Sequence, residues 1–390
     1  MQKLFTIQQK MKIKKYKLKY SESDIRFVKN EIQKTLELGY LTDGGPNVEL
    51  FENMWSNFNG SKNSIAVSSC TTGLECILRA IDVAGKSVVV PAYTFIASVM
   101  SIYNCGGKPV YCDIAKETLG LSLKNIKKAV RSDTKAVMIV HVGGVITNEI
   151  VKIREYCDSK GLILIEDAAC AHGAEFNNIK SGNFGHAACF SFHHSKVLTC
   201  GEGGIITTSS DELAKKIRRI RAIGLDRKIN NYESFEIGSN SKMSEVTAIL
   251  AILHVKNAKK IIAERRKLAK LYDEKIKFNS KIVKFEIPND TKSGYYKYFI
   301  RVNEGNTHLI NEFFEYAKSL GIDLPPRTYS YTCDEQNVSK KMNCIVNSLE
   351  NSYFMKNHHF CLPMYNNMTK EEINYIIDVV NKFIENVNAN

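Results

Sequence analysis

Short runs of consecutive apolar residues alternate with amphipathic segments from residue 64 onwards. Seven of these runs have the length of strands, and they lie at residues 64–68, 87–91, 108–113, 136–141, 162–167, 187–192 and 204–208. Segments with helical spacing lie between them, for example at residues 72–81, 123–130 and 148–157. Because strands that are apolar on both faces are covered on both faces, the pattern predicts a mostly parallel sheet between layers of helices.

The segments on either side of this region are predicted to be mainly helical. Helical spacing occurs at residues 21–38, 48–57, 244–277, 309–320 and 369–387, and residues 295–302 have the pattern of a strand. Ser21 or Ser23 can cap the first of these helices. Thr369 and Glu372 have the spacing of a capping box at the start of the last one.

The predicted fold class is α/β, with a large domain built on a mostly parallel mixed sheet and a smaller α+β domain at the C-terminus. A chain of 390 residues has room for both. Residues 1–20 form a basic leader, residues 21–260 the large domain and residues 261–390 the small domain. The boundary falls inside the long helix, near Lys260. Active sites in such sheets lie beyond the carboxyl ends of the strands.

Composition narrows the class of protein. No run approaches the ~20 apolar residues that a membrane span requires, and the N-terminus lacks the apolar core of a signal peptide. The eleven cysteines are odd in number, and several lie inside apolar runs without the spacing of metal ligands. We therefore expect buried free thiols, no metal site, no membrane association and a cytoplasmic location.

The net charge of +13 indicates a basic surface. Such a surface suits nucleic acid or an anionic substrate, or it consists of solvated lysine faces. No helix-turn-helix, zinc-finger or aromatic RNA-binding pattern accompanies the charge, so we favour solvated faces and expect no nucleic-acid partner.

Two residues at predicted strand ends indicate the chemistry. Asp167 ends the run at residues 162–167, and Lys196 follows the run at residues 187–192, just before a Gly-rich turn at residues 201–204. A buried carboxylate beside a lysine is the pair that a pyridoxal phosphate (PLP) enzyme needs. The lysine forms the Schiff base, and the carboxylate keeps the pyridine nitrogen protonated. The alternatives are a helix cap or structural ion pair for Asp167 and a solvated side chain for Lys196.

Further residues near the strand ends suit the rest of such a cofactor. Thr71 and Thr72 are predicted to be the first residues of a helix, where free backbone N–H groups and hydroxyls bind a phosphate. Ser191 supplies a further hydroxyl, and the ring of Phe95 can stack on a pyridine. Taken singly, the threonines read as a helix cap and Phe95 as core packing.

Nine motifs along the chain resemble one family. They are LTDGGP at 41–46, VSSCTTGL at 67–74, PAYTFIA at 91–97, VHVGG at 140–144, EDAACAHGA at 166–174, FSFHHSK at 190–196, GEGG at 201–204, GSNSKMSE at 238–245 and LPMY at 362–365. From about residue 41 to the C-terminus the chain resembles the DegT/DnrJ/EryC1/StrS sugar aminotransferases, which have the fold type I (aspartate aminotransferase-like) architecture. Several motifs in the right order make a chance match very unusual.

The resemblance implies a role for each candidate residue. Lys196 would be the Schiff-base lysine, Asp167 would bind the pyridine nitrogen, and Phe95 would stack on the ring. Thr71, Thr72 and Ser191 would hold the phosphate. Asn240 would reach the phosphate from a partner subunit, which implies a homodimer with shared active sites.

The resemblance also implies the reaction. The enzyme would transfer an amino group from glutamate to a nucleotide-linked keto sugar, in the biosynthesis of amino sugars for surface polysaccharide, glycan or a secondary metabolite. Lys196 favours transamination, because one branch of the family has histidine at that place and removes a hydroxyl. A dehydratase or cyclitol aminotransferase of the same family is the alternative, and a non-enzymatic regulator or nucleic-acid binder is a remote one.

The chain departs from the family pattern at three places. One is Cys70, which stands where the phosphate loop of the family commonly has a glycine. Cys170 stands where the family has Gln or His near the ring hydroxyl of the cofactor, and a thiol is a weaker hydrogen-bond partner. The stretch at residues 238–242 lacks the family's aromatic residues and its arginine. As candidate substrate contacts we name His172, His193 and Tyr331, the last in a loop at residues 327–337.

Overall fold

A seven-stranded sheet forms the centre of the larger part of the chain, in the strand order β1-β9-β8-β5-β4-β2-β3. The computed structural model describes residues 11–42, 45–226, 229, 232–325 and 327–389. The strands are β1 (Asn63–Val67), β2 (Ser87–Pro91), β3 (Lys108–Cys112), β4 (Thr134–Val140), β5 (Ile163–Asp167), β8 (Ala187–Ser191) and β9 (Gly204–Thr208). β9 runs antiparallel to both of its neighbours, and the other neighbouring pairs are parallel. The seven strands predicted from the apolar runs are confirmed.

Alternate residues of each strand face two different helical layers. In β2, Val88 and Val90 pack in one core cluster and Val89 in the other, as the period of two in a strand requires. One layer consists of α3 (Cys70–Ala80), α4 (Ile96–Asn104) and α7 (Asp211–Arg221). The other consists of α2 (Pro46–Asn59), α5 (Leu123–Ala129), α6 (Ile150–Ser159) and α8 (Glu245–Lys256). The sheet is therefore buried on both faces, as the sequence predicted.

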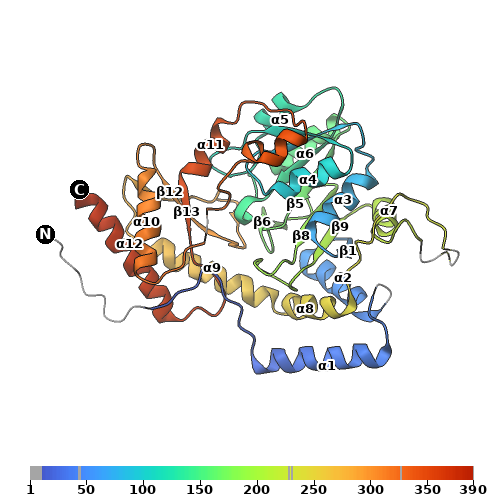
Figure 1. Cartoon of the computed structure of the whole chain (residues 1–390), viewed down its shortest axis with the longest axis horizontal. Helices are drawn as coiled ribbons and strands as arrows, with labels where there is room; N and C mark the ends of the chain where they lie inside the picture. The colour runs from blue at the N-terminus through green and yellow to red at the C-terminus, as the bar shows by residue number, and fades with distance from the viewer. Residues whose placement is uncertain (1–10, 43–44, 227–228, 230–231, 326, 390) are drawn as a thin grey trace.

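The C-terminal part of the chain builds a second, smaller core. A three-stranded antiparallel sheet is formed by β10 (Ile282–Lys284), β12 (Tyr298–Val302) and β13 (His359–Leu362). It packs with α9 (Ala258–Lys275), α10 (His308–Ser319) and α12 (Lys370–Ala389). Figure 1 shows these elements at one end of the molecule and the large sheet at the other, with α9 between them.

The remaining elements are short. They are β6 (Glu175–Phe176), β7 (Ile179–Lys180) and β11 (Thr291–Lys292), which form a small sheet, together with α11 (Glu350–Asn357) and the 3-10 turns Val142–Gly144, Cys333–Glu335 and Asn337–Lys341. Two- and three-residue strands carry too little apolar pattern to be predicted from sequence.

The predicted helix at residues 244–277 is two helices. α8 ends at Lys256, Asn257 caps it, and α9 begins at Ala258. Ile262 of α9 still packs with the core of the large sheet, whereas Leu268 packs in the small core. These contacts support the domain boundary that we propose near Lys260.

The predicted caps at the ends of the chain are confirmed. Ser21, and not Ser23, caps α1 (Glu22–Leu38) and forms a capping box with Asp24. Thr369 Oγ1 accepts from the N–H of Glu372 at 3.1 Å, and the Glu372 carboxylate accepts from the N–H of Thr369 at 2.9 Å. Each pair satisfies N–H groups that the first helical turn leaves free.

The described part of the leader is docked on the small core. Ile13 is buried there, its N–H donates to the Gly321 carbonyl at 2.9 Å, and its carbonyl accepts from the N–H of Asp323 at 2.8 Å. From this anchor the chain passes to α1, which contacts α8. Among the described residues, the helices are all too short or too polar to cross a membrane.

Candidate active site

The candidate residues predicted from the sequence follow parallel strands and meet at one edge of the large sheet. β1, β2, β5 and β8 run in the same direction, so their carboxyl ends lie side by side. Thr71 follows β1, Phe95 follows β2, Asp167 ends β5 and Lys196 follows β8. The fold therefore brings together residues that are far apart in the sequence.

Asp167 is a buried carboxylate with neutral partners. Only 5% of its surface is exposed. Its Oδ2 accepts from the Ser98 hydroxyl at 2.7 Å, and its Oδ1 accepts from the N–H of Ala169 at 3.1 Å. These two bonds fix the plane of the carboxylate, which aims it at a fixed point of the site.

Lys196 lies in the loop after β8, and its amine is close to Cys170. Nζ is 3.2 Å from the Cys170 sulfur and 4.6 Å from the centre of the Tyr296 ring. Burial favours the neutral amine, but the Cys170 and Tyr296 groups outweigh burial and raise the pKa of Lys196.

The catalytic lysine candidate and the carboxylate candidate share neighbours. Cys170 comes three residues after Asp167 in the chain and contacts Lys196. The Cys70 thiol is within electrostatic range of both Asp167 and Lys196. The two groups therefore surround one site.

The start of α3 differs in detail from the prediction. Ser69 caps this helix, which begins at Cys70, and the Thr72 hydroxyl bonds to Ser69 within a capping box. The Thr72 side chain is thus engaged by the helix cap, while Thr71 is partly exposed in the first turn. The prediction that Thr71 and Thr72 are the first helical residues was wrong by one position.

A glycine allows this helix start to approach the sheet. A Cβ on Gly204 of β9 would lie 2.7 Å from the Cys70 nitrogen and 2.7 Å from the Ser69 carbonyl carbon. Real Cβ contacts are never that short, so only glycine permits this packing. The GEGG motif therefore places the N-terminus of α3 beside Ser191, which pairs with Gly204 across the sheet.

Phe95 is the most exposed of the predicted site residues that follow the strands. Its side chain is 61% exposed, and it forms the N-cap position of α4. Ser98, the partner of Asp167, lies one turn further along the same helix, and its N–H donates to the Phe95 carbonyl at 3.1 Å. A large apolar ring left open beside a buried carboxylate is a suitable surface for a flat ligand.

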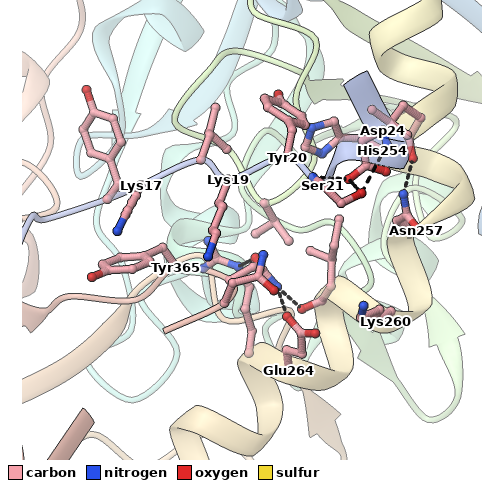
Figure 2. A pocket seen from close by; sticks show the side chains of 18 of the residues that line it. Lys17, Lys19, Tyr20, Ser21, Asp24, His254, Asn257, Lys260, Glu264 and Tyr365 are labelled. Carbon is pink, nitrogen blue, oxygen red and sulfur yellow. Dashed lines mark hydrogen bonds between the residues drawn. The ribbon is translucent and has the colours of Figure 1, made fainter. Parts of the chain in front are cut away.

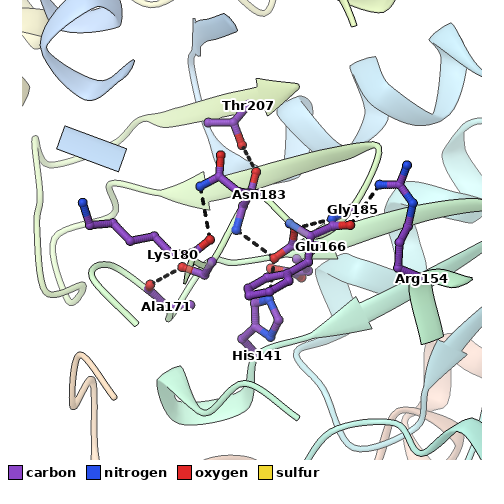
Figure 3. A network of polar contacts seen from close by, with 12 residues as sticks. His141, Arg154, Glu166, Ala171, Lys180, Asn183, Gly185 and Thr207 are labelled. Carbon is purple, nitrogen blue, oxygen red and sulfur yellow. Dashed lines mark hydrogen bonds and ion pairs between the residues drawn. The ribbon is translucent and has the colours of Figure 1, made fainter. Parts of the chain in front are cut away.

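A second polar network lies beside Asp167 in the same strand. Glu166 is fully buried, and its carboxylate is 2.8 Å from His141 Nε2. It also accepts backbone N–H bonds from Gly182, Phe184 and Gly185 (Figure 3). Burial opposes ionisation, but these partners keep the pKa of Glu166 below its usual value. Adjacent strand residues point to opposite faces, so Glu166 supports the strand while Asp167 faces the site.

Three residues near the site were missed by the sequence reasoning. They are Ser98, Tyr296 and Tyr329. Tyr329 packs edge-on against Tyr93 at 5.2 Å between ring centres. Burial, followed by the nearby Cys170 and Asp167 groups, raises the pKa of Tyr329, so its hydroxyl stays protonated at neutral pH.

The proposed substrate contacts lie in different surroundings. His172 has no exposed surface and packs among Trp55, Phe190 and Phe192, and burial lowers its pKa to about 3. The ring is therefore neutral and belongs to the core. His193 is half-buried in the loop before Lys196, with Nδ1 2.9 Å from the Ser195 hydroxyl.

The other two predicted residues are on the surface. Tyr331 is 62% exposed, in the loop whose Cys333 N–H donates to the Ala92 carbonyl at 2.8 Å. Asn240 is exposed and forms a β-bridge with Ala222. A residue that serves the site of a second subunit has to be exposed in this way.

The side chains at this edge fit pyridoxal phosphate. A protonated pyridine nitrogen would give the buried Asp167 carboxylate the cationic partner that burial favours. The open ring of Phe95 matches a flat aromatic face, and the first turn of α3 with Ser191 matches a phosphate. Cys170 is the weak point of the match, since a thiol is a poor partner for a ring hydroxyl.

Comparison with known proteins independently identifies the family that the sequence motifs resemble. The model of the DegT/DnrJ/EryC1/StrS aminotransferase family matches residues 23–381. GDP-perosamine synthase of Caulobacter vibrioides is 31% identical over 293 residues, which cover 75% of this chain and 78% of that protein. The dTDP-4-dehydro-2,3,6-trideoxy-D-glucose 4-aminotransferase of Saccharopolyspora spinosa is 29% identical over 274 residues, covering 66% and 71%.

A solved structure confirms the predicted architecture. NtdA of Bacillus subtilis, whose crystal structure contains the cofactor PMP, superposes with a TM-score of 0.84 at 24% identity, covering 94% of this chain and 83% of that one. The expected fold type I arrangement of a large, mostly parallel sheet and a small C-terminal part is thus confirmed.

Proposed function

The chain belongs to the DegT/DnrJ/EryC1/StrS aminotransferase family, and from this membership and the site geometry we propose that it transfers an amino group from glutamate to a nucleotide-linked keto sugar. Enzymes of this family are PLP-dependent sugar aminotransferases. One observation carries the proposal. The Lys196 amine contacts Cys170, and Cys170 is only three residues after the buried Asp167 in the chain.

Each residue of the site has a part in holding the cofactor. Lys196 would attach it, and Asp167, aimed by Ser98, would bind the pyridine nitrogen. Phe95 would cover one face of the ring. Thr71 and Ser191, with the free N–H groups of the first turn of α3, would hold the phosphate, and Thr72, whose hydroxyl bonds to Ser69 in the helix cap, would fix this turn beside it.

The bound cofactor supplies an electron sink for the carbanion that forms at the substrate carbon. The protein supplies the proton transfers. Lys196 is the basic group at this position, so it would remove the proton at the donor carbon and return one at the acceptor carbon, as general base and then general acid. Cys170 and Tyr296 limit where the amine can lie, because the Cys170 sulfur is 3.2 Å from Nζ and the centre of the Tyr296 ring is 4.6 Å from it.

The names of two relatives support the proposed acceptor, and the exposure of Asn240 supports the proposed assembly. The two relatives described above act, by their names, in the chemistry of GDP-linked and dTDP-linked sugars. We propose a nucleotide diphosphate sugar as acceptor, for amino-sugar biosynthesis. We also propose a homodimer in which the exposed Asn240 completes the phosphate site of the partner subunit.

A substrate panel tests this function. The protein is loaded with PLP and incubated with glutamate and a series of GDP- and dTDP-linked keto sugars, and 2-oxoglutarate and the sugar product are measured by mass spectrometry. We expect one equivalent of 2-oxoglutarate per amino sugar, and no product from Lys196→Ala. A deoxygenated sugar formed without 2-oxoglutarate would instead identify a dehydratase.

A further inference from the structure

A cavity of about 380 Å³ adjoins the loop that carries Lys196. Its walls come from the leader, from α8 and α9 around Asn257, from the loop at residues 194–197 and from residues 365–367. Neither Asp167 nor Phe95 lines it. Lys196 itself lines it, so the cavity adjoins the lysine but not the other two cofactor residues, and its volume is within the range of small-molecule sites.

The leader crosses this cavity as an extended segment with two different faces. Tyr16 places its hydroxyl 3.2 Å from His194 Nε2, and Tyr20 places its hydroxyl 3.3 Å from His254 Nε2. Side chains alternate in extended chain, so the lysines between these tyrosines take the other side. Figure 2 shows Lys17 and Lys19 directed toward the side of the cavity where Tyr365 lies.

Both ends of this crossing segment are fixed. Ile13 pairs with Ile322 on the small core, and Tyr20 contacts His254, which is itself buried on α8. Burial lowers the pKa of His254 to about 4, so the ring is neutral and suits a hydrogen bond with a tyrosine hydroxyl. The two lysines are thus held over the cavity by a backbone anchored on each side.

The lining carries an excess of positive charge. Lys17, Lys19, Lys260 and Arg265 are its cations besides Lys196, and Asp24 and Glu264 are its carboxylates. The carboxylates already have partners, since Asp24 accepts from the N–H and hydroxyl of Ser21 and Glu264 accepts from the Asn366 amide at 3.2 Å.

The buried cation is also fixed. Burial lowers the pKa of Arg265 to about 10, which still leaves the guanidinium charged at neutral pH. It donates to the Tyr295 carbonyl at 2.8 Å and to the Asn366 amide oxygen at 3.2 Å. Lys17 and Lys19 are exposed and form no ion pair with any residue in the described ranges. The surface thus has two available ammonium groups two residues apart.

We propose that this cavity binds the diphosphate of the nucleotide-linked substrate, with Lys17 and Lys19 of the leader as its cationic contacts. The inference rests on the proposed function for the identity of the ligand. Two ammonium groups on one face of an extended segment match two adjacent phosphates. A diphosphate held here lies beside residues 194–197, so the attached sugar is delivered to the loop of Lys196. The leader is then a substrate-binding element.

The test is a binding measurement on the PLP-loaded protein. GDP and dTDP are titrated by calorimetry, with guanosine as a probe that lacks phosphates. We expect GDP or dTDP to bind and guanosine not to bind detectably. The double variant Lys17→Ala/Lys19→Ala should weaken the nucleotide by about tenfold or more, because two charge-assisted contacts are lost.

The matched control is Lys12→Ala/Lys14→Ala, which removes the same charge from the same leader but from residues that do not line this cavity. We expect its affinity to stay within about twofold of the wild type. Equal weakening by both double variants, or no weakening by the first, overturns the proposal. The cofactor absorbance and the glutamate half-reaction report on the aminotransferase function separately, and both should be unchanged in each variant.

Discussion

At the scale of single residues, the site depends on how a buried carboxylate is aimed. The Ser98 hydroxyl is 2.7 Å from Asp167 Oδ2. Ser98 reaches Asp167 from the first turn of α4, whose N-cap is Phe95. A single side chain therefore links the aim of the carboxylate to the helix that presents the ring of Phe95.

Replacing Ser98 by Ala should lower turnover without unfolding the protein. A hydrogen bond to a charged acceptor contributes about 1.5–3 kcal/mol, so we expect kcat to fall by about 10- to 100-fold. Steady-state kinetics with glutamate measure it, and the absorbance spectrum of the bound cofactor should shift with it. Ser98→Thr, which keeps the hydroxyl, is the control; a loss as large as that of the alanine variant would show that packing and not the hydrogen bond is responsible.

A second residue-scale prediction concerns acid stability. His359 is buried as the neutral ring, with Nδ1 bonded to the Met355 carbonyl and Nε2 accepting from the N–H of Thr328 at 3.1 Å. Burial lowers the pKa of His359 to about 3 from 6.5, so below pH 6.5 the unfolded chain binds a proton that the folded chain does not. Stability therefore falls as the pH falls, by about 1.4 kcal/mol per pH unit for this group.

The variant His359→Gln should flatten this acid limb. Urea unfolding between about pH 6 and pH 4.5 should give a slope lower by about 1.4 kcal/mol per pH unit than the wild type. His308→Gln, at an exposed histidine, is the control and should leave the slope unchanged. Parallel curves for the wild type and the His359 variant would contradict the account.

The sequence identified Asp167 and Lys196 because Asp167 ends one short apolar run and Lys196 follows another, and such runs mark the ends of buried strands. It could not identify Ser98, because its partner is 69 positions away and the contact exists only after the sheet has assembled. Tyr296 lies in the segment 295–302 that has the pattern of a strand, but this pattern does not show that Tyr296 lies near Lys196. Tyr329 lies in a loop with no periodicity, so nothing in the local pattern places it near Asp167 and Cys170. At residues 15–20 lysines alternate with Tyr16, Leu18 and Tyr20, and this alternation was a signal of an extended segment with two faces.

At the scale of elements, α2 begins on a carboxylate from another helix. The first-turn N–H groups of Asn47 and Val48 donate to the two oxygens of Glu245 at 2.6 and 3.0 Å, and Glu245 is buried at the start of α8. A Cβ on Gly45 would lie 2.5 Å from the Glu245 carboxyl carbon, so glycine precedes α2 for reasons of space. The motifs at residues 41–46 and 238–245 are therefore joined in the structure.

Replacing Glu245 by Ala should be costly for the fold. Two buried N–H groups lose their acceptor, so we expect the free energy of unfolding to fall by about 2–5 kcal/mol. Glu49→Ala in the first turn of α2, at an exposed position, is the matched control and should change it by at most about 0.5 kcal/mol. Chemical denaturation measures both, and equal effects would show that α2 does not depend on this cap.

At the scale of the whole molecule, two cores share one site. The large sheet supplies Asp167 and the loop of Lys196, while Tyr296 comes from the segment that leads into β12 of the small core. The leader joins them, since Ile13 is buried in the small core and Tyr20 contacts α8. Because the leader is held between the two cores, two of its lysines, Lys17 and Lys19, line a cavity. The net charge of +13 does not reveal this placement, so its role could not be interpreted from the sequence.

The central claim is that Lys196 attaches pyridoxal phosphate at the edge where Asp167 lies. The most direct test is to load the protein with the cofactor, reduce it with borohydride, digest it and locate the added mass by peptide mass spectrometry. The account predicts one label per chain, on Lys196, and none there after Lys196→Ala. A label on another lysine, or an unlabelled chain, would contradict it.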